Sequence, residues 1–490
     1  NIVKLLKSLL GLCRVFQIVG DENITISSIT FDTRKIETCS NGETLYIAQK
    51  GVQTDGHLYI DQAIEKGARA IVCEKIPENI VEGVCYVQVA NASVALGRIA
   101  SAFYDHPSRK LKLVGITGTN GKTTTVTLLH RLFMSLGYPT GLLSTIVNKI
   151  NETEIPATHT TPDAIELNRL LNAMVEAGCS YCFMEVSSHA IVQHRIEGLQ
   201  FAGGIFSNIT HDHLDFHKTF LNYIQAKKSF FNYLSKDAFA LTNLDDKNGE
   251  TMVDNSPARK FTYSINSGAD FKAKIQNNSF DGLHLIIDGT EVYFKICGKF
   301  NAYNLLAIYG TAILLGENKE DVLVKMSNLE EPNGRFQIIK GSNGRCAVVD
   351  YAHTPDALKN VLSTIKEITE NSVKVITVVG CGGNRDALKR PVMAEVACKY
   401  SDKVILTSDN PRNEDPRAII SDMEAGVPAE FKKNHVVVIE NREDAIKTAC
   451  MIMEGNDVLL IAGKGHETYQ EIKNVKHHFD DSEVVEKYIN

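Results

Sequence analysis

The sequence has little of what marks a membrane protein, a protein that coats nucleic acid, or a secreted disulfide-rich domain. No apolar stretch approaches the ~20 residues that a membrane helix requires. Basic residues do not outnumber acidic ones: 52 Lys and Arg stand against 59 Asp and Glu, and the formal net charge is −7. This balance argues against non-specific binding to nucleic acid or to anionic membranes. The 11 cysteines are odd in number and scattered, which fits reduced thiols better than a disulfide framework.

The beginning of the sequence also lacks the continuous hydrophobic segment of a signal peptide. Lys4, Lys7 and Arg14 interrupt the apolar residues, and no small-residue cleavage site follows. We expect a short amphipathic helix over residues 1–14. The absence of an initiator Met indicates a trimmed or incomplete start, and we expect the protein to work in the cytoplasm.

The length of the chain indicates several domains. A chain of 490 residues exceeds what one hydrophobic core usually holds, and a content of 43% hydrophobic and 23% charged residues is that of an ordinary globular protein. No internal repeat or low-complexity linker is present. The alternation of strand-like and helix-like segments predicts three α/β domains, at residues 1–109, 110–333 and 334–490.

Hydrophobic periodicity gives each domain a coarse secondary structure. The first domain is a small α/β unit with strands at 24–31, 44–48, 70–72 and 85–89 and a helix at 90–104. The central domain has the spacing of a mainly parallel sheet, with strands at 111–117, 181–186, 204–207 and 239–242 and a helix at 124–136. The third domain repeats this alternation, with helices at 355–369, 391–400, 416–425 and 443–453 between strands. It therefore reads as a Rossmann-like, doubly wound sheet.

A glycine-rich loop after the first central strand predicts an ATP site. The stretch Gly115-Ile-Thr-Gly-Thr-Asn-Gly-Lys-Thr-Thr124 leads from an apolar strand into an amphipathic helix. Free backbone N–H groups and the helix dipole make such a junction an anion site. Lys122 supplies a cation for the β- and γ-phosphates, and the Thr123 hydroxyl is suited to magnesium. The spacing differs from the general P-loop, because five residues rather than four separate Gly115 from Gly121.

Two further segments of the central domain carry groups suited to metal or phosphate. Glu185 ends an apolar strand, where a carboxylate either ligates magnesium or is simply solvated. The segment from Asn208 to His217 holds three His and two Asp residues. This composition is compatible with binding of magnesium or phosphate, with histidines that have a structural role, or with a zinc site. Lys227 and Lys228 lie on a predicted helix, and by themselves two adjacent lysines indicate a solvated face.

The third domain places four polar loops at predicted strand ends. In an open α/β sheet, ligands bind outside the carboxyl ends of the strands. The loops are rich in Arg and acidic residues, which suits a substrate with both carboxylates and an ammonium group. They are Asp350–Asp356, Gly380–Asp386, Asp409–Arg412 and Gly463–Glu467.

Two smaller features favour structural roles. The polar loop residues Phe31–Arg34 and Gln53–Thr54 of the first domain are suited to a ligand, but simple turn chemistry accounts for them as well. Cys179 and Cys182 form a C-x-x-C, but no second Cys pair lies nearby. Buried free thiols explain this pair better than a redox or zinc site.

Taken together, these motifs resemble those of the Mur ligase family. The glycine loop matches the ATP loop of that family, including its five-residue gap. The other matching motifs follow in the same order: Met184–His189, Asp212–His217, Phe300–Asn304, Gly334–Phe336, Val349–Asp356 and Ala462–Glu467. The resemblance covers the central and C-terminal domains well and the N-terminal domain more loosely. It is closest to the members that add the third amino acid of the peptidoglycan peptide.

The resemblance implies where the nucleotide and the metal bind. ATP would contact Gly118, Thr119, Asn120, Gly121, Lys122, Thr123, Thr124, Asn304, Arg335 and Asp350. Magnesium would be held by Thr123, Glu185, His213 and Lys227, the last as a carbamate. The catalytic set implied is Lys122, Glu185, His213 and Lys227.

The resemblance also implies where the two other substrates bind. The substrate UDP-MurNAc-L-Ala-D-Glu would lie along Phe31, Thr33, Val52, Gln53, Thr54, His159, Thr160, Thr161, Ser187, Gln193 and Arg195. An incoming meso-diaminopimelate would contact Arg390, Asp409, Asn410, Pro411, Arg412, Gly463 and Glu467. The γ-carboxylate of D-Glu would attack ATP to give an acyl phosphate, which the incoming amine then opens.

The motif Asp409-Asn-Pro-Arg412 carries the choice of amino acid. It resembles the form found in ligases that add diaminopimelate. Arg412 would bind the distal carboxylate of diaminopimelate, a group that lysine lacks. The alternative for Arg412 is a surface residue at a helix start. One departure is Asn384, which stands where many relatives have Asp; its effect on substrate choice is open.

Several alternatives remain at this point. The ligase could add L-lysine or a close diaminopimelate analogue instead. A folylpolyglutamate synthase-like ligase would share the ATP loop, and a non-ligase P-loop protein would bind or turn over ATP without the other substrates. We expect a monomer with small-molecule substrates, and neither a nucleic-acid nor a membrane partner.

Overall fold

The computed structural model describes residues 1–37, 41–51, 53–157, 161–210, 219–432 and 434–490. The chain divides into two compact units, Asn1–Lys274 with Tyr303–Met326, and Ile275–Ala302 with Ser327–Asn490. The first unit contains the predicted N-terminal domain and most of the central one. The boundaries of the three predicted domains stay a prediction.

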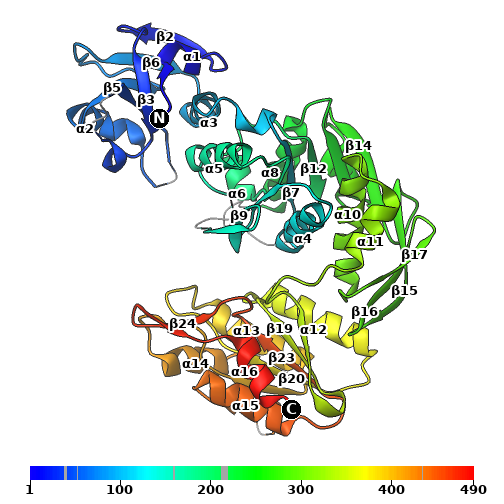
Figure 1. Cartoon of the computed structure of the whole chain (residues 1–490). Coiled ribbons are helices and arrows are strands. Elements are labelled where there is room, and N and C mark those ends of the chain that lie inside the picture. Colours follow the sequence, from blue (N-terminus) through cyan, green and yellow to red (C-terminus); the bar gives the residue numbers. More distant parts are fainter. Residues whose placement is uncertain (38–40, 52, 158–160, 211–218, 433) are drawn as a thin grey trace. The chain divides into compact units, whose positions relative to one another are not determined.

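The N-terminal part of the first unit is a six-stranded sheet (Figure 1). Its order is β1-β3-β4-β5-β6-β2, in which the inner strands β3 to β6 are parallel and the outer β1 and β2 are antiparallel. The strands are β1 (Lys4–Leu5), β2 (Val15–Val19), β3 (Thr25–Thr30), β4 (Glu43–Ile47), β5 (Ala68–Cys73) and β6 (Cys85–Val89). The helices are α1 (Leu6–Leu9), α2 (Ile60–Glu65), α3 (Ala92–Phe103) and the 3₁₀ turns η1 (Thr33–Lys35), η2 (Gly56–Tyr59) and η3 (Pro107–Arg109).

The start of the chain differs from the predicted amphipathic helix. Only α1, of four residues, is helical there, because Lys4 and Leu5 pair with β3 as strand β1. Leu6 and Leu9 of α1 are still buried in the core of this sheet. The spacing of the apolar residues therefore predicted correctly that they are buried, but the predicted helix over residues 1–14 is too long.

The central part of the first unit is a mainly parallel sheet. Its order is β10-β9-β8-β11-β7-β12-β13-β14-β15, with β8 and β11 through β14 parallel to β7 and the edge strands β9 and β10 antiparallel. The strands are β7 (Lys112–Thr117), β8 (Thr140–Leu143), β9 (Val147–Ile150), β10 (Thr153–Pro156), β11 (Tyr181–Glu185), β12 (Gly203–Phe206), β13 (Phe239–Asn243), β14 (Arg259–Ser264) and β15 (Phe271–Ser279). The helices are α4 (Lys122–Ser135), α5 (Ala164–Glu176), α6 (Ser188–Val192), α8 (Phe220–Tyr233), α9 (Gly249–Val253), α10 (Lys299–Leu314) and α11 (Lys319–Met326).

The register of this sheet gathers three strand ends. Strand β7 lies between β11 and β12, and Glu185 of β11 is level with Ile116 while Phe206 of β12 is level with Thr117. The residues that follow all three strands therefore lie at one edge of the sheet, beside the start of α4. This arrangement confirms the predicted α/β fold class with a P-loop-like strand, loop and helix.

The second unit contains an open Rossmann-like sheet of order β18-β19-β23-β20-β21-β22. All its strands are parallel except the edge strand β18. The strands are β18 (Gln337–Lys340), β19 (Cys346–Asp350), β20 (Val375–Val379), β21 (Lys403–Leu406), β22 (Val436–Val438) and β23 (Val458–Ala462). The helices are α12 (Pro355–Thr369), α13 (Lys389–Tyr400), α14 (Pro416–Glu424), α15 (Arg442–Ile452), α16 (Asp481–Tyr488) and the 3₁₀ turn η4 (Ser342–Gly344). The unit also holds the hairpins β16 (Gly282–Ile287) with β17 (Thr290–Phe294), and β24 (Tyr469–Ile472) with β25 (Val475–His478).

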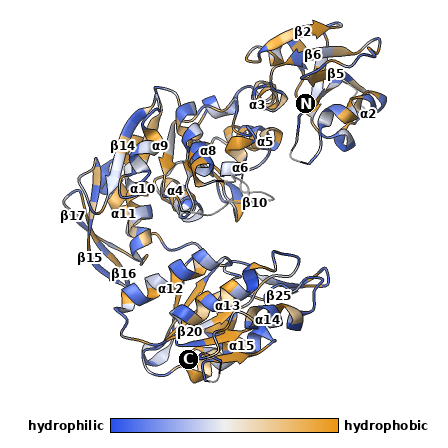
Figure 2. Cartoon of the chain, turned by 180° about the vertical axis from the view of Figure 1, so that it is seen from behind, coloured by the Kyte–Doolittle hydropathy of each residue, from blue (hydrophilic) through white to orange (hydrophobic). Residues whose placement is uncertain are grey.

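The apolar strands of this sheet have helices on both faces, and Figure 2 shows the hydrophobic residues concentrated along them. The core on one face packs against α12, α13 and α14, and the core on the other face packs against α15 and α16. Among the described residues, no helix combines the length and the apolar character that crossing a bilayer demands.

One fully buried ion pair joins the helices of the second face to the strand ends. The guanidinium of Arg442, at the start of α15, donates from Nε and Nη2 to the two carboxylate oxygens of Asp481, each at 2.8 Å. The same guanidinium donates to the carbonyl oxygens of Ser408 and Ala462, at 3.2 and 3.1 Å. Arg442 therefore ties the ends of β21 and β23 to the two helices.

We expect the removal of this pair to destabilise the second unit strongly. Replacing Asp481 by Asn leaves the Arg442 charge buried without its counter-ion, which costs about 3 kcal/mol of unfolding free energy. Hydrogen exchange of the β23 amides measures the loss. The matched control is Lys487→Met, because Lys487 and Glu443 join the same two helices through an exposed ion pair and exchange should change little. Equal exchange in both variants would show that the buried pair does not hold this face together.

Candidate functional site

The loop between β7 and α4 requires glycine at two positions. Gly118 and Gly121 have φ of +150° and +91°, in the region that side chains disfavour. A Cβ on Gly118 would lie 1.9 Å from Ser207 Oγ, and one on Gly121 would lie 2.5 Å from Asn304 Oδ1. The glycines therefore allow the loop to pack against the end of β12 and against α10. This contact also places Asn304 beside the loop.

Hydrogen bonds hold this loop in shape. Asn208 accepts from the backbone N–H of Thr119 at its carbonyl oxygen (2.8 Å) and from that of Asn120 at Oδ1 (3.0 Å). Lys122 Nζ folds back and donates to the carbonyl oxygens of Gly118 (2.7 Å) and Thr119 (3.3 Å). These contacts hold the loop in one shape, with the Lys122 ammonium against its carbonyl oxygens and the N-terminus of α4 at its end.

Thr123 and Glu185 form an oxygen-donor pair beside this loop. The Thr123 hydroxyl donates to Glu185 Oε1 at 2.9 Å. The other carboxylate oxygen accepts from the Thr145 backbone N–H at 2.6 Å and from its hydroxyl at 3.0 Å. Glu185 is 1% exposed, so the solvated strand end considered as an alternative is wrong. A hydroxyl and a carboxylate at the phosphate loop are the ligand types that Mg²⁺ takes.

Lys227 is buried rather than on a solvated face. Its side chain is 1% exposed, and Nζ donates to the carbonyl oxygen of Gly118 at 3.1 Å. The ammonium also lies 4.8 Å from the centre of the Tyr223 ring. Burial together with the charges of Arg195 and Lys227 lowers the pKa of His189. Lys227 is therefore part of the phosphate-loop site.

Four predicted substrate residues form a connected network next to Glu185. The Thr161 hydroxyl donates to the Glu185 carbonyl oxygen at 3.0 Å and accepts from the Ser187 backbone N–H at 3.2 Å. Arg195 donates to the Thr161 carbonyl oxygen at 2.8 Å and to Gln193 Oε1 at 2.7 Å. Burial lowers the pKa of Arg195.

The remaining predicted residues of the first unit are less informative. Thr33 is buried in η1, Phe31 packs on the core of the N-terminal sheet, and Gln53 and Thr54 are exposed. The predicted site residues Val52, His159, Thr160 and His213 lie outside the described residues, as does most of the His-rich segment. Within the described part of the chain, no three His, Cys, Asp or Glu side chains converge as a metal site. Cys179 and Cys182 are buried free thiols, as expected.

In the second unit, Asp350 ends strand β19 and lies within the electrostatic influence of Arg335. Asp350 accepts from the backbone N–H groups of Phe336 and Ala352, both at 2.8 Å, and burial raises the pKa of its carboxyl. The Arg335 guanidinium lies 5.1 Å from the centre of the Tyr351 ring. Burial, and then Arg335, lower the pKa of His466 to about 4. The predicted pair is therefore held at the end of β19.

The polar loops of the second unit surround a cavity of about 500 Å³. Six of the seven residues predicted for the amino-acid substrate line it: Arg390, Asp409, Asn410, Arg412, Gly463 and Glu467. The predicted loops Asp350–Asp356 and Gly380–Asp386 also contribute to the lining, with Tyr351, His353, Thr354, Gly380, Cys381, Gly382, Arg385 and Asp386. Three lining residues lie outside the loops that the sequence indicated: Lys389, Met393 and Tyr469.

The guanidinium of Arg412 is fixed at the cavity wall. Nη1 donates to the carbonyl oxygen of Gly383 at 2.9 Å, and Nε lies 3.4 Å from Glu471 Oε2. The backbone of Arg412 pairs with β24, with its N–H donating to the Glu471 carbonyl oxygen at 3.0 Å. Arg412 has a φ of +51°. The hairpin β24–β25, which periodicity missed, thus orients the residue predicted to select the substrate.

Arg390 has a different environment from the one expected of a substrate ligand. Its guanidinium contacts the carboxylates of Glu414 (2.8 Å) and Asp422 (3.0 Å) and the carbonyl oxygen of Gly382 (3.2 Å), and its side chain is 4% exposed. It therefore ties α13 to α14 and to the Gly380 loop. Arg385 lines the same cavity and donates from Nη1 to the carbonyl oxygen of Asn384 at 3.2 Å.

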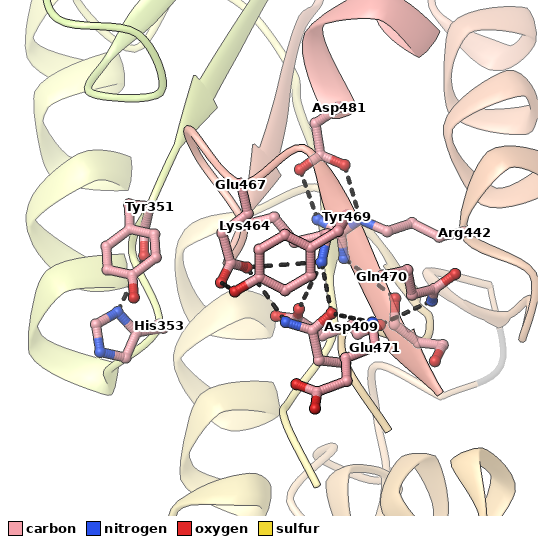
Figure 3. A network of polar contacts seen from close by, with 12 residues as sticks. Tyr351, His353, Asp409, Arg442, Lys464, Glu467, Tyr469, Gln470, Glu471 and Asp481 are labelled. Atoms are coloured by element: carbon pink, nitrogen blue, oxygen red, sulfur yellow. Dashed lines mark hydrogen bonds and ion pairs between the residues drawn. The ribbon is translucent and has the colours of Figure 1, made fainter. Parts of the chain in front are cut away.

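An acidic cluster completes the cavity (Figure 3). Asn410 Nδ2 donates to Glu467 Oε1 at 3.3 Å, and the Tyr469 hydroxyl donates to Glu467 Oε2 at 3.3 Å. Gly463 has a φ of +116°, and a Cβ there would lie 2.8 Å from Asp409 Oδ2. Burial raises the pKa of Glu467, while Lys464 lowers it. The cavity therefore combines carboxylates, which suit an ammonium group, with the guanidinium groups of Arg385 and Arg412, which suit carboxylates.

Comparison with known proteins agrees with this geometry. Three family descriptions match the chain: "Mur ligase family, catalytic domain" over residues 25–104, "Mur ligase middle domain" over 116–312, and "Mur ligase, glutamate ligase domain" over 334–465. A UDP-N-acetylmuramoyl-L-alanyl-D-glutamate–2,6-diaminopimelate ligase from Cytophaga hutchinsonii is 56% identical over 99% of both chains. One from Clostridium acetobutylicum is 40% identical, again over 99% of both chains.

Solved structures give the same picture. A structure of a UDP-N-acetylmuramoyl-L-alanyl-D-glutamate–2,6-diaminopimelate ligase aligns with a TM-score of 0.69 at 32% identity, over 95% of this chain and 94% of that one. A folylpolyglutamate synthase from Thermotoga maritima shares the fold, with a TM-score of 0.58 at 16% identity over 76% of this chain and 90% of that one. Because relatives 40% to 56% identical align along almost its full length, the chain belongs to the Mur ligase family.

Proposed function

We propose that this chain is an ATP-dependent amide ligase that adds meso-diaminopimelate to the D-Glu γ-carboxylate of UDP-MurNAc-L-Ala-D-Glu in peptidoglycan precursor synthesis. The observation that carries the choice of amino acid is the cavity of the second unit, where Arg412 is fixed beside Asp409, Asn410 and Glu467. A diaminopimelate molecule has two ammonium and two carboxylate groups, and this lining offers partners of both signs.

The first unit carries the activation step. A carboxylate is a poor electrophile, so the γ-carboxylate of D-Glu first attacks the γ-phosphorus of ATP; the bond to ADP breaks and an acyl phosphate forms. Lys122 and the N-terminus of α4 stabilise the negative charge on the transferring phosphoryl group. The amine then attacks the acyl carbon, and phosphate leaves with the C–O bond electrons.

Thr123 and Glu185 fit a magnesium ion at this loop, since both present oxygen atoms there. We assign them, with His213, as its ligands. When bound, magnesium neutralises charge on the β- and γ-phosphates. Lys227, buried beside Gly118, is the proposed site of a carbamate that would add a further anionic oxygen ligand. The N-terminal sheet, Thr161, Ser187, Gln193 and Arg195 are assigned to the UDP-linked peptide.

Arg385, rather than Arg390, is the group we assign to the proximal carboxylate of diaminopimelate. Arg390 already contacts two carboxylates, so its charge is compensated within the protein. Arg385 lines the same cavity, and no carboxylate among the described residues pairs with it. Work in the cytoplasm and as a monomer remains part of the proposal.

The ATP side is tested by Glu185→Gln. The amide keeps an oxygen that accepts from Thr123, but it loses the charge that a divalent cation prefers. We expect the magnesium concentration for half-maximal phosphate release to rise about tenfold. Glu250→Gln, at an exposed position on α9, is the control and should not shift it. An unchanged magnesium requirement in Glu185→Gln would remove Glu185 from the ligand set.

The amino-acid side is tested by Arg412→Ala. Loss of the guanidinium leaves the distal carboxylate of diaminopimelate without its charged partner, so kcat/KM for diaminopimelate should fall by roughly 10²-fold. The rate with L-lysine should change much less. Steady-state phosphate release with each amino acid gives both values.

Arg417→Ala is the matched control, because the Arg417 side chain is 83% exposed, pairs with Glu440 and is not among the residues that line the cavity. A wild-type enzyme that prefers lysine would contradict the diaminopimelate assignment. Equal losses for both amino acids in Arg412→Ala would show that Arg412 supports the fold rather than the choice of substrate.

A further inference from the structure

Lys464 is buried behind the wall of the amino-acid cavity. Its side chain is 0% exposed, and it is absent from the described residues that line the cavity. Nζ donates to Asn410 Oδ1 at 2.8 Å, and it lies 3.5 Å from Asp409 Oδ1 and 3.6 Å from Glu467 Oε1 (Figure 3). Asn410, Asp409 and Glu467 themselves line the cavity. Lys464 thus contacts the groups that we assign to the substrate without reaching the substrate.

The charges of this cluster explain why an ammonium is buried there. Asp409 and Glu467 are 8% and 14% exposed at the side chain, and two carboxylates so close would repel each other without a cation between them. Lys464 compensates one of the two charges. One negative charge then remains for an ammonium group of the incoming amino acid.

We propose that Lys464 is a positioning residue that keeps Glu467 ionised at the cavity wall and thereby sets the affinity for the amino-acid substrate. The inference rests on the proposed function, because it assumes that Glu467 binds a substrate ammonium. Geometry supports it: Asn410 accepts from Lys464 and donates to Glu467 Oε1, so the ammonium and the amide together hold the carboxylate in place.

The electrostatic environment of Glu467 agrees with this role. Burial raises the pKa of its carboxyl; Lys464 lowers it, Asp409 raises it, and hydrogen bonds from Tyr469 and Asn410 lower it. The charged and titratable groups that face Glu467 from all elements packed against it are Lys464, Tyr469, Asp409, Tyr351 and Arg442. Without Lys464, the pKa of Glu467 is therefore expected to rise further.

The variant Lys464→Met tests this. Because only ionised Glu467 attracts the ammonium, KM for diaminopimelate at pH 7 should rise about tenfold for each unit by which the pKa of Glu467 rises above 7. The lost affinity should return as pH rises, so the acid limb of kcat/KM for diaminopimelate moves to higher pH. The value of kcat at saturation and KM for ATP should stay unchanged, which a general loss of structure would not allow.

The control is Lys476→Met, which removes an exposed lysine 4.4 Å from the Tyr469 ring of the same hairpin; it should leave KM and the pH profile unchanged. An unchanged KM for diaminopimelate and an unchanged acid limb in Lys464→Met overturn the proposal.

If Lys464→Met does not fold, a double variant replaces it. Lys464→Met/Glu467→Gln removes one charge of each sign, and its KM is compared with that of the single variant Glu467→Gln. A KM within about threefold of the single variant supports action through Glu467, and a larger rise overturns it. Absence of wild-type turnover with diaminopimelate overturns the proposed function, and this inference with it.

Discussion

The carboxyl ends of parallel strands meet at one edge of a sheet, and both sites of this protein depend on that constraint. In the first unit it places Glu185, the glycine loop and Ser207 together, although dozens of residues separate them in the chain. In the second unit it gathers the loops after β20, β21 and β23 around one cavity. The side chains then need only short connections to reach a common ligand.

Charge compensation is the second organising feature. Arg442 is buried with Asp481, Lys464 is buried beside Asp409 and Glu467, and Arg412 and Glu467 line the cavity. Each buried cation is matched by carboxylates or carbonyl oxygens, because an unmatched buried charge is costly. The wall groups thus hold fixed positions before any substrate arrives.

Much of this could be predicted from the sequence, and the misses have physical causes. The glycine loop, Glu185 and the helices of the second unit follow from local pattern, and α12 begins and ends where periodicity placed it. Hairpin β24–β25 was missed because Tyr469–Ile472 carries no run of buried residues. The two ion pairs of Arg390 could not be predicted, because Glu414 and Asp422 are distant in sequence and reach Arg390 only after α13 packs against α14. Burial of Lys227 likewise depends on tertiary packing, and only family resemblance had singled it out.

The backbone conformation of Arg412 lowers the stability of the fold, whereas its side chain is proposed to select the amino-acid substrate. With a φ of +51°, this position favours Gly or Asn over a long side chain, at a cost of order 1 kcal/mol. Replacement of Arg412 by Gly or Asn would remove this conformational cost. The backbone preference at this position therefore favours the loss of the arginine, and with it a change of substrate toward lysine. The guanidinium at this turn, and with it the recognition of a second carboxylate that we propose for Arg412, is therefore kept at a cost in local folding energy.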